Sequence, residues 1–135
     1  MHFELFGPDI FDYLVHRFER VVLYPFKTFY FKRFHVFPIC IRSHWILAVA
    51  EIKYKNIKGK NIPKRVDIKI MDSLELSERS EEAFSVLKRF YVTKIGNDYK
   101  VTLGSCAIKP HVDKKLIQPN GHDCGPFIIY NFWKG

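Results

Sequence analysis

Cysteine is scarce in this chain of 135 residues, and no two cysteines form a CxxC pair. The three present are Cys40, Cys106 and Cys124. An odd and sparse count argues against a disulfide scaffold and favours a reducing compartment, so we expect an intracellular protein, nuclear or cytoplasmic. His122 stands close to Cys124 but lacks a second pair of ligands, so we expect no structural zinc site, no other metal and no cofactor.

Long apolar runs, repeats and low-complexity tracts are also missing. A membrane-spanning helix needs roughly 18 apolar residues, and a signal peptide needs a basic segment before an apolar one. We therefore expect neither, and no membrane partner. The length fits one domain over residues 1–135, which we expect to be a monomer. The hydrophobic fraction of 47% and the aromatic fraction of 16% are enough for a real core.

Acidic residues are outnumbered, with Asp+Glu 14 against Lys+Arg 22, which gives a net charge of +8. Such an excess favours an acidic partner: nucleic acid, an anionic membrane or an acidic protein. Residues 53–64 hold five lysines together with asparagines, a glycine and a proline, and we predict a loop there. One hypothesis is a nucleic-acid-binding module that uses this loop and the aromatic residues of 24–34. The other is a solvated loop and ordinary core aromatics.

Hydrophobic periodicity predicts a mixture of helices and strands. One helix is expected to start at Asp9 and run to Phe18, and a second to start at Ser77 and end soon after Lys88 and Arg89. A turn is expected at Gly96–Asp98, and a helix buried on all sides is expected to follow Cys124. Strands are predicted at 36–41, 44–52, 66–71, 99–103 and 115–118.

Three polar residues stand at the ends of these predicted core elements. Cys124 would open the last helix, whose N-terminus lowers a thiol pKa and so favours the nucleophilic thiolate. His44 begins one apolar strand, and Asp72 ends another. Each has an ordinary explanation on its own: a small buried thiol, a strand-end histidine and a turn aspartate. Together they match a nucleophile, its base and the group that orients the base.

Three short motifs in this order resemble a known family. They are His44-Trp45, Met71-Asp72-Ser73-Leu74 and Gln118-Pro119-Asn120-Gly121-His122-Asp123-Cys124-Gly125. The chain is similar in them to the ubiquitin-like-protein-specific cysteine proteases, which include SUMO proteases and their deneddylating and viral relatives. The resemblance implies an α+β, papain-like cysteine-protease fold, with a small central mixed sheet flanked by helices. It also implies hydrolysis after the C-terminal Gly-Gly of a ubiquitin-like modifier, in deconjugation or precursor processing. Among these modifiers, SUMO is the one we expect.

The resemblance implies a role for each matching residue. Cys124 would be the nucleophile, His44 its base, Asp72 the group that orients His44, and Gln118 a donor to the oxyanion. Trp45 would cover the channel for the glycine tail, where only glycine lets a backbone pass so close to packed aromatics; the alternative is a core tryptophan. Phe6-Gly7-Pro8-Asp9 stands where the family usually has Trp-Leu-Asn-Asp, and only Asp9 matches. The channel's second aromatic is therefore either absent or supplied by Phe6.

Two departures from the family pattern qualify these expectations. The 28 residues from His44 to Asp72 make a longer gap than is usual, and the chain stops at Gly135, soon after the catalytic helix begins. We therefore expect a domain that is short at its C-terminus. The alternatives are a catalytically weak or inactive modifier-binding domain of the same family, or a deneddylating protease. We expect no nucleic-acid partner, because that hypothesis leaves residues 118–125 unexplained.

Overall fold

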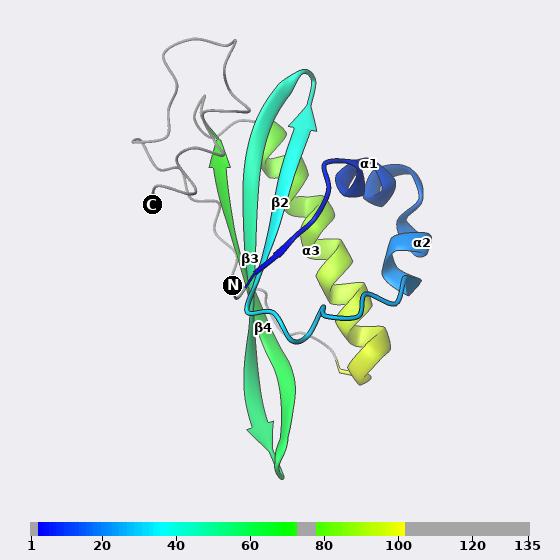
Figure 1. Cartoon of the computed structure of the whole chain (residues 1–135), viewed down its shortest axis with the longest axis vertical. Coiled ribbons are helices and arrows are strands. Elements are labelled where there is room, and N and C mark those ends of the chain that lie inside the picture. Colours follow the sequence, from blue (N-terminus) through cyan, green and yellow to red (C-terminus); the bar gives the residue numbers. More distant parts are fainter. Residues whose placement is uncertain (1–2, 73–77, 102–135) are drawn as a thin grey trace.

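The computed structural model describes residues 3–72 and 78–101, which form a four-stranded mixed sheet with helices on one face (Figure 1). The strands lie in chain order: β1 (Phe3–Leu5), β2 (Phe34–Ile41), β3 (His44–Ile57) and β4 (Lys60–Asp72). Strand β1 runs parallel to β2, and the other neighbours are antiparallel. The helices are α1 (Asp9–His16), α2 (Phe18–Leu23) and α3 (Glu78–Tyr99). The predicted α+β class is confirmed.

Alternation along β3 explains why the sheet has two distinct faces. Ile46, Ala48 and Ala50 point to the helices and are at most 1% exposed. Leu47 points to the other face, where it forms a smaller apolar cluster with Val36. Helix α3 completes the main core with buried residues three or four positions apart, which places them on one side of the helix. These are Ser80, Ala83, Leu87, Phe90, Tyr91, Lys94 and Ile95.

Aromatic rings fill the space between α3, the sheet and the segment that leads into β2. Phe6 stacks on Phe37 with ring centroids 4.5 Å apart, and Phe29 packs edge-on against Phe90. His35 lies within this cluster and is 0% exposed. Its Nε2 lies 2.7 Å from the Phe29 carbonyl oxygen and its Nδ1 lies 2.7 Å from the Tyr91 hydroxyl. Of the aromatic segment, Phe29 is core as expected, whereas Phe31 is 83% exposed.

The lysine-rich segment is not the loop that its composition suggested. Strands β3 and β4 pair through it, from Lys53 opposite Arg65 to Ile57 opposite Lys60. A two-residue turn of Lys58 and Gly59 closes the hairpin, and both have positive φ, 51° and 82°. Such a turn matches the right-handed twist of paired strands. Ladder pairing therefore outweighs the low strand propensity of lysine and asparagine here.

Helix α3 is longer than predicted and runs through the expected turn at residues 96–98. Lys88 and Arg89 consequently lie in its middle, and its last helical residue is Tyr99, where a strand was expected. Tertiary contacts hold these turns. The Lys94 ammonium, buried at 5% exposure, pairs with Asp98 at 3.2 Å, and Tyr30 donates a hydrogen bond to Asp98.

The remaining elements differ from expectation mainly in their bounds. The three central strands are confirmed but longer, and the first predicted helix is confirmed as α1, which ends at His16. Strand β1 and helix α2 were not predicted. The strand expected at 115–118 and the helix expected after Cys124 lie outside the described residues. Across the described ranges, no helix combines the length and apolarity needed to cross a membrane.

Candidate active site

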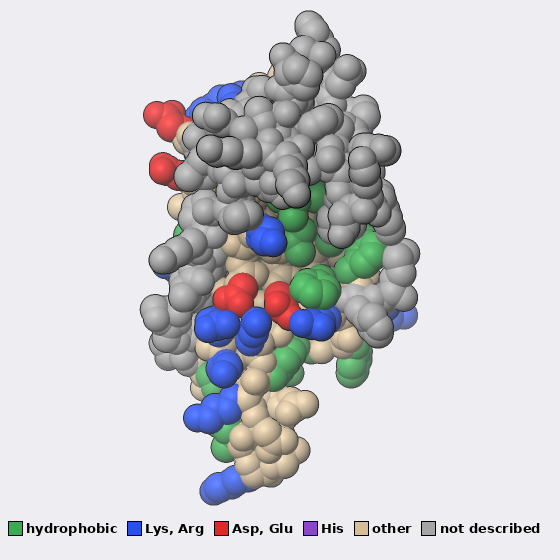
Figure 2. All heavy atoms as spheres, turned by 90° about the vertical axis from the view of Figure 1, so that its left-hand side faces the viewer, with side chains coloured by type: hydrophobic (Ala, Val, Ile, Leu, Met, Phe, Trp, Pro, Cys, Tyr) green, Lys and Arg blue, Asp and Glu red, His purple; other side chains and the backbone are tan. Residues whose placement is uncertain are grey.

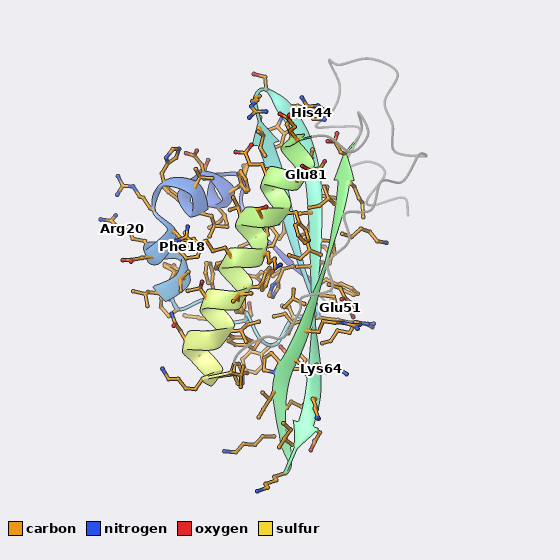
Figure 3. The ribbon with its side chains drawn as sticks, turned by 180° about the vertical axis from the view of Figure 1, so that it is seen from behind. Phe18, Arg20, His44, Glu51, Lys64 and Glu81 are labelled. Atoms are coloured by element: carbon orange, nitrogen blue, oxygen red, sulfur yellow. The ribbon has the colours of Figure 1, made fainter. Side chains whose placement is uncertain are left out.

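His44 is positioned by the tight turn that joins β2 and β3. Arg42 and Ser43 form this turn with φ of 51° and 63°, and Ile41 pairs with His44 across it. Because side chains alternate along a strand, His44 shares the helix-covered face with Ile46. Figure 3 shows His44 beside the first turns of α3. Its exposed fraction is only 5%.

Asp72 reaches His44 from the end of the neighbouring strand. Asp72 pairs with Ile46 across β3 and β4, so His44 is its diagonal neighbour on the same face. Diagonal side chains in an antiparallel pair lie close enough for long side chains to meet. Here His44 Nε2 and Asp72 Oδ1 are 2.6 Å apart, and Asp72 is 0% exposed. The structure therefore brings these two predicted site residues together.

The hydrogen bond to Asp72 decides which nitrogen of His44 is available to accept a proton. An ionised carboxylate only accepts hydrogen bonds, so Nε2 carries the proton and donates it. In the neutral ring Nδ1 then has the free lone pair. Among the described residues, Nδ1 of His44 has no hydrogen-bond partner. This arrangement, a base with one nitrogen held by a buried carboxylate and the other available, suits general-base chemistry.

Ser80 is a site residue that the sequence did not reveal. Its Oγ donates a 2.8 Å hydrogen bond to Asp72 Oδ2, so each oxygen of the carboxylate is held by a different side chain. Ser80 is 0% exposed and lies in the first turn of α3. The available signal was its position, one helical turn after the predicted cap Ser77 and on the buried stripe of the helix.

Trp45 and Phe6 lie away from the His44–Asp72 pair. Trp45 is partly buried on the opposite sheet face from His44, against the cluster of Val36 and Leu47. Its predicted place over the glycine channel stays a prediction. Phe6 is 4% exposed inside the aromatic core, which gives it a packing role. The channel role predicted for Phe6 also stays a prediction.

Cys124 and Gln118 lie outside the described residues, so their roles stay predictions. Cys40 is a free, exposed thiol on β2. In the described part of the chain, no three His, Cys, Asp or Glu side chains are grouped so as to hold a metal ion. The described part of the candidate site is thus His44, held by the buried carboxylate of Asp72, and the predicted nucleophile lies outside it.

Comparison with known proteins gives matches to one family. A family model described as "Ulp1 protease family, C-terminal catalytic domain" matches residues 23–132. No curated protein sequence matches the chain.

Two solved structures share the fold. One is titled the crystal structure of the de-sumoylating protease, with a TM-score of 0.76, 24% identity and coverage of 98% of this chain and 51% of that one. The other is the Ulp1-like SUMO protease catalytic domain of Chaetomium thermophilum, with a TM-score of 0.50, 22% identity and coverage of 96% and 48%. The chain therefore spans about half the length of each.

Proposed function

The chain belongs to the Ulp1 protease family, and on this basis we propose that it is a cysteine protease cleaving after the C-terminal Gly-Gly of a SUMO-type modifier. The observation that carries the proposal is the 2.6 Å hydrogen bond from His44 Nε2 to Asp72. It leaves Nδ1 as the base and holds the imidazole with a buried carboxylate. Buried His35 has hydrogen-bond partners at both ring nitrogens, whereas His44 has one only at Nε2 among the described residues.

In the proposed reaction His44 takes the proton of the Cys124 thiol, and Asp72 stabilises the resulting imidazolium. The thiolate attacks the carbonyl carbon of the terminal glycine, and the oxyanion accepts hydrogen bonds from Gln118 and the Cys124 backbone N–H. The C–N bond breaks, and the amine leaves with the proton from His44. Water then hydrolyses the thioester, with His44 as general base, and restores the thiol.

The substrate class follows from the family and from glycine's lack of a side chain. A channel lined by aromatic rings, to which Trp45 would contribute, admits an extended Gly-Gly tail but no residue with a Cβ. Support for SUMO comes from the two solved structures, which are a de-sumoylating protease and a SUMO protease catalytic domain by their titles. Both an isopeptide bond to lysine and a precursor peptide bond present the same glycine carbonyl.

A SUMO probe with a C-terminal electrophile tests the proposal. We expect covalent labelling that Cys124→Ala abolishes and that His44→Gln and Asp72→Asn slow by orders of magnitude, since a wrong tautomer disables the base. Cys40→Ala is the matched control and should label normally, because Cys40 is exposed and lies on the sheet face opposite His44 and Asp72. Folded protein that does not react, or Cys124→Ala that reacts equally, would refute the enzymatic reading.

The same assay separates the alternatives. Equal labelling by a Nedd8 probe and none by the SUMO probe would assign the chain to deneddylation. Binding of unmodified SUMO without labelling would assign it to the inactive, modifier-binding class.

A further inference from the structure

One part of the hairpin projects beyond the rest of the sheet (Figure 1). The last pair between β2 and β3 is Phe34 with Glu51, and past this point the described parts of β3 and β4 pair only with each other. We call residues 52–66 the basic ribbon. Its strands extend about 20 Å, at roughly 3.3 Å per residue, and it is two strands wide.

The basic ribbon carries cations and no acidic residue. Its six positive side chains are Lys53, Lys55, Lys58, Lys60, Lys64 and Arg65. At its base, Lys53 and Arg65 are balanced by Glu51 and Asp67. The four lysines nearer the tip are exposed and have no acidic partner within the ranges that the structure describes. Figure 2 shows basic side chains along the hairpin and acidic ones only where it joins the body.

The kind of residue at the tip favours a polyanion over a protein partner. Protein interfaces are enriched in aromatic residues and arginine and depleted in lysine. The one aromatic residue of the ribbon, Tyr54, instead donates a 3.1 Å hydrogen bond to the Tyr30 carbonyl oxygen, and Pro63 beside it is buried. Lysine ammoniums on flexible stems are point charges suited to phosphates.

We propose that the basic ribbon binds double-stranded nucleic acid through its phosphates, without reading sequence. The major groove of DNA, about 12 Å wide, admits a two-stranded ribbon, and lysines on both edges then face a phosphate strand. The expectation of no nucleic-acid partner rested on residues 118–125, which that hypothesis leaves unexplained, and residues 53–64 were expected to form a solvated loop. These residues instead form a paired ribbon, which keeps the lysines close to one another. Their positive charges repel, and a bound polyanion would relieve this repulsion. This proposal does not depend on the proposed protease activity.

The test is the salt dependence of binding to a fluorescent 20-base-pair DNA duplex, followed by anisotropy. Four phosphate contacts predict a slope of log K against log salt of about −3.6, so affinity falls about 100-fold between 50 and 200 mM NaCl. The variant Lys55→Ser, Lys58→Asn, Lys60→Ser should lose about 2.7 of that slope. Asparagine is used at position 58 because it tolerates the positive φ there.

A matched variant controls for net charge. Lys27→Ser, Lys88→Ser, Lys100→Asn removes the same charge from exposed positions outside the ribbon, including one with positive φ, 57° at Lys100. Its slope should stay within one unit of the original. An equal fall in the salt slope in the two variants would overturn the proposal, and so would the absence of duplex binding at 50 mM NaCl. So would binding of phosphatidylserine vesicles or of poly-glutamate in place of the duplex. Circular dichroism of both variants excludes unfolding as the cause.

Discussion

The carboxylate of Asp72 is held at both oxygens, by His44 on one and by Ser80 on the other. Ser80 is 0% exposed and would act on the reaction only through Asp72, as a positioning residue. A hydrogen bond to a charged group contributes about 1.5–3 kcal/mol. Without it the carboxylate can rotate, and the imidazolium of His44 loses part of its orientation and stabilisation.

Ser80→Ala should therefore lower kcat/KM on a SUMO substrate about ten-fold or more. It should also raise the apparent pKa of the Cys124 thiol, measured as the alkylation rate by iodoacetamide against pH, because the thiolate pairs with a less stable imidazolium. A loss of folding stability alone would not move this pKa. Ser85→Ala, an exposed change on the same helix, is the control. An unchanged pKa in Ser80→Ala would show that Ser80 only packs.

His35 gives the fold a dependence on pH. The Phe29 carbonyl can only accept, so Nε2 donates to it and Nδ1 accepts from Tyr91. Burial lowers the pKa of His35 from 6.5 to about 4. The unfolded chain thus binds a proton between these values and the folded chain does not. The contribution of neutral His35 to the free energy of unfolding is therefore fully present above pH 6.5. It falls by roughly 3 kcal/mol as the pH falls towards 4.

Urea unfolding at pH 7, 5.5 and 4 checks this prediction. His35→Gln should be less stable at pH 7, and its loss between pH 7 and 4 should be smaller by about 3 kcal/mol, since carboxylates contribute equally in both proteins. If the free energy of unfolding changed with pH by the same amount in both proteins, the prediction would be contradicted.

The sequence predicts both members of the His44–Asp72 pair but not Ser80, which holds the second carboxylate oxygen. His44 and Asp72 were predictable because each ends an apolar strand and stands in a family motif. Ser80 was not, because a serine early in a helix usually satisfies the helix's own N–H groups. Phe6 is a core residue in its described contacts, and the channel role that its motif position implies stays a prediction.

At the level of elements, the turn between β2 and β3 controls the placement of His44. Arg42 and Ser43 both adopt positive φ, which costs non-glycine residues roughly 1–2 kcal/mol each. The geometry is that of a two-residue hairpin turn, for which Asn-Gly is the preferred sequence. Arg42 also lies 3.7 Å from Glu82 of α3, an exposed pair of small value.

Replacing Arg42-Ser43 by Asn-Gly should raise the free energy of unfolding by about 1 kcal/mol and leave probe labelling unchanged. Inserting one residue into the turn should instead abolish labelling. A one-residue shift moves His44 to the other sheet face, away from Asp72. Thermal unfolding and probe labelling of both variants measure these effects. An active insertion variant would show that the turn does not set the register.

The elements that sequence predicted best were those with strong local patterns. The central strands have long apolar or alternating runs, and their existence was confirmed. The second half of α3 and the hairpin of residues 53–65 were missed because glycine, asparagine and lysine indicate turns. In α3 the burial of Lys94 and Ile95 outweighs this tendency. In the hairpin, the turn tendency of these residues is outweighed by hydrogen-bonded pairing between β3 and β4, which the composition of a short segment does not reveal.

For the whole molecule, the basic ribbon should be separable from the body. Its outer part pairs with no other described strand, whereas Tyr54, the partner of Pro63, donates a hydrogen bond to Tyr30 of the body. Replacing residues 55–62 by Asn-Gly closes the hairpin directly after that pair. We expect a melting temperature within a few degrees of the original, normal SUMO-probe labelling and loss of duplex binding. A large fall in melting temperature would show that the ribbon supports the core.

Strand β3 joins the two ends of the molecule, with His44 at its start and Ile57 at its far end. At 3.3 Å per residue these ends are separated by up to about 40 Å, several Debye lengths at physiological salt. A polymer held by the ribbon would then neither block the histidine nor alter its charge. It would act as an anchor, raising the local concentration of modified proteins bound to the same polymer. Strand β3 would thus act as a spacer between the ribbon, which binds the polymer, and His44, where cleavage is proposed to occur.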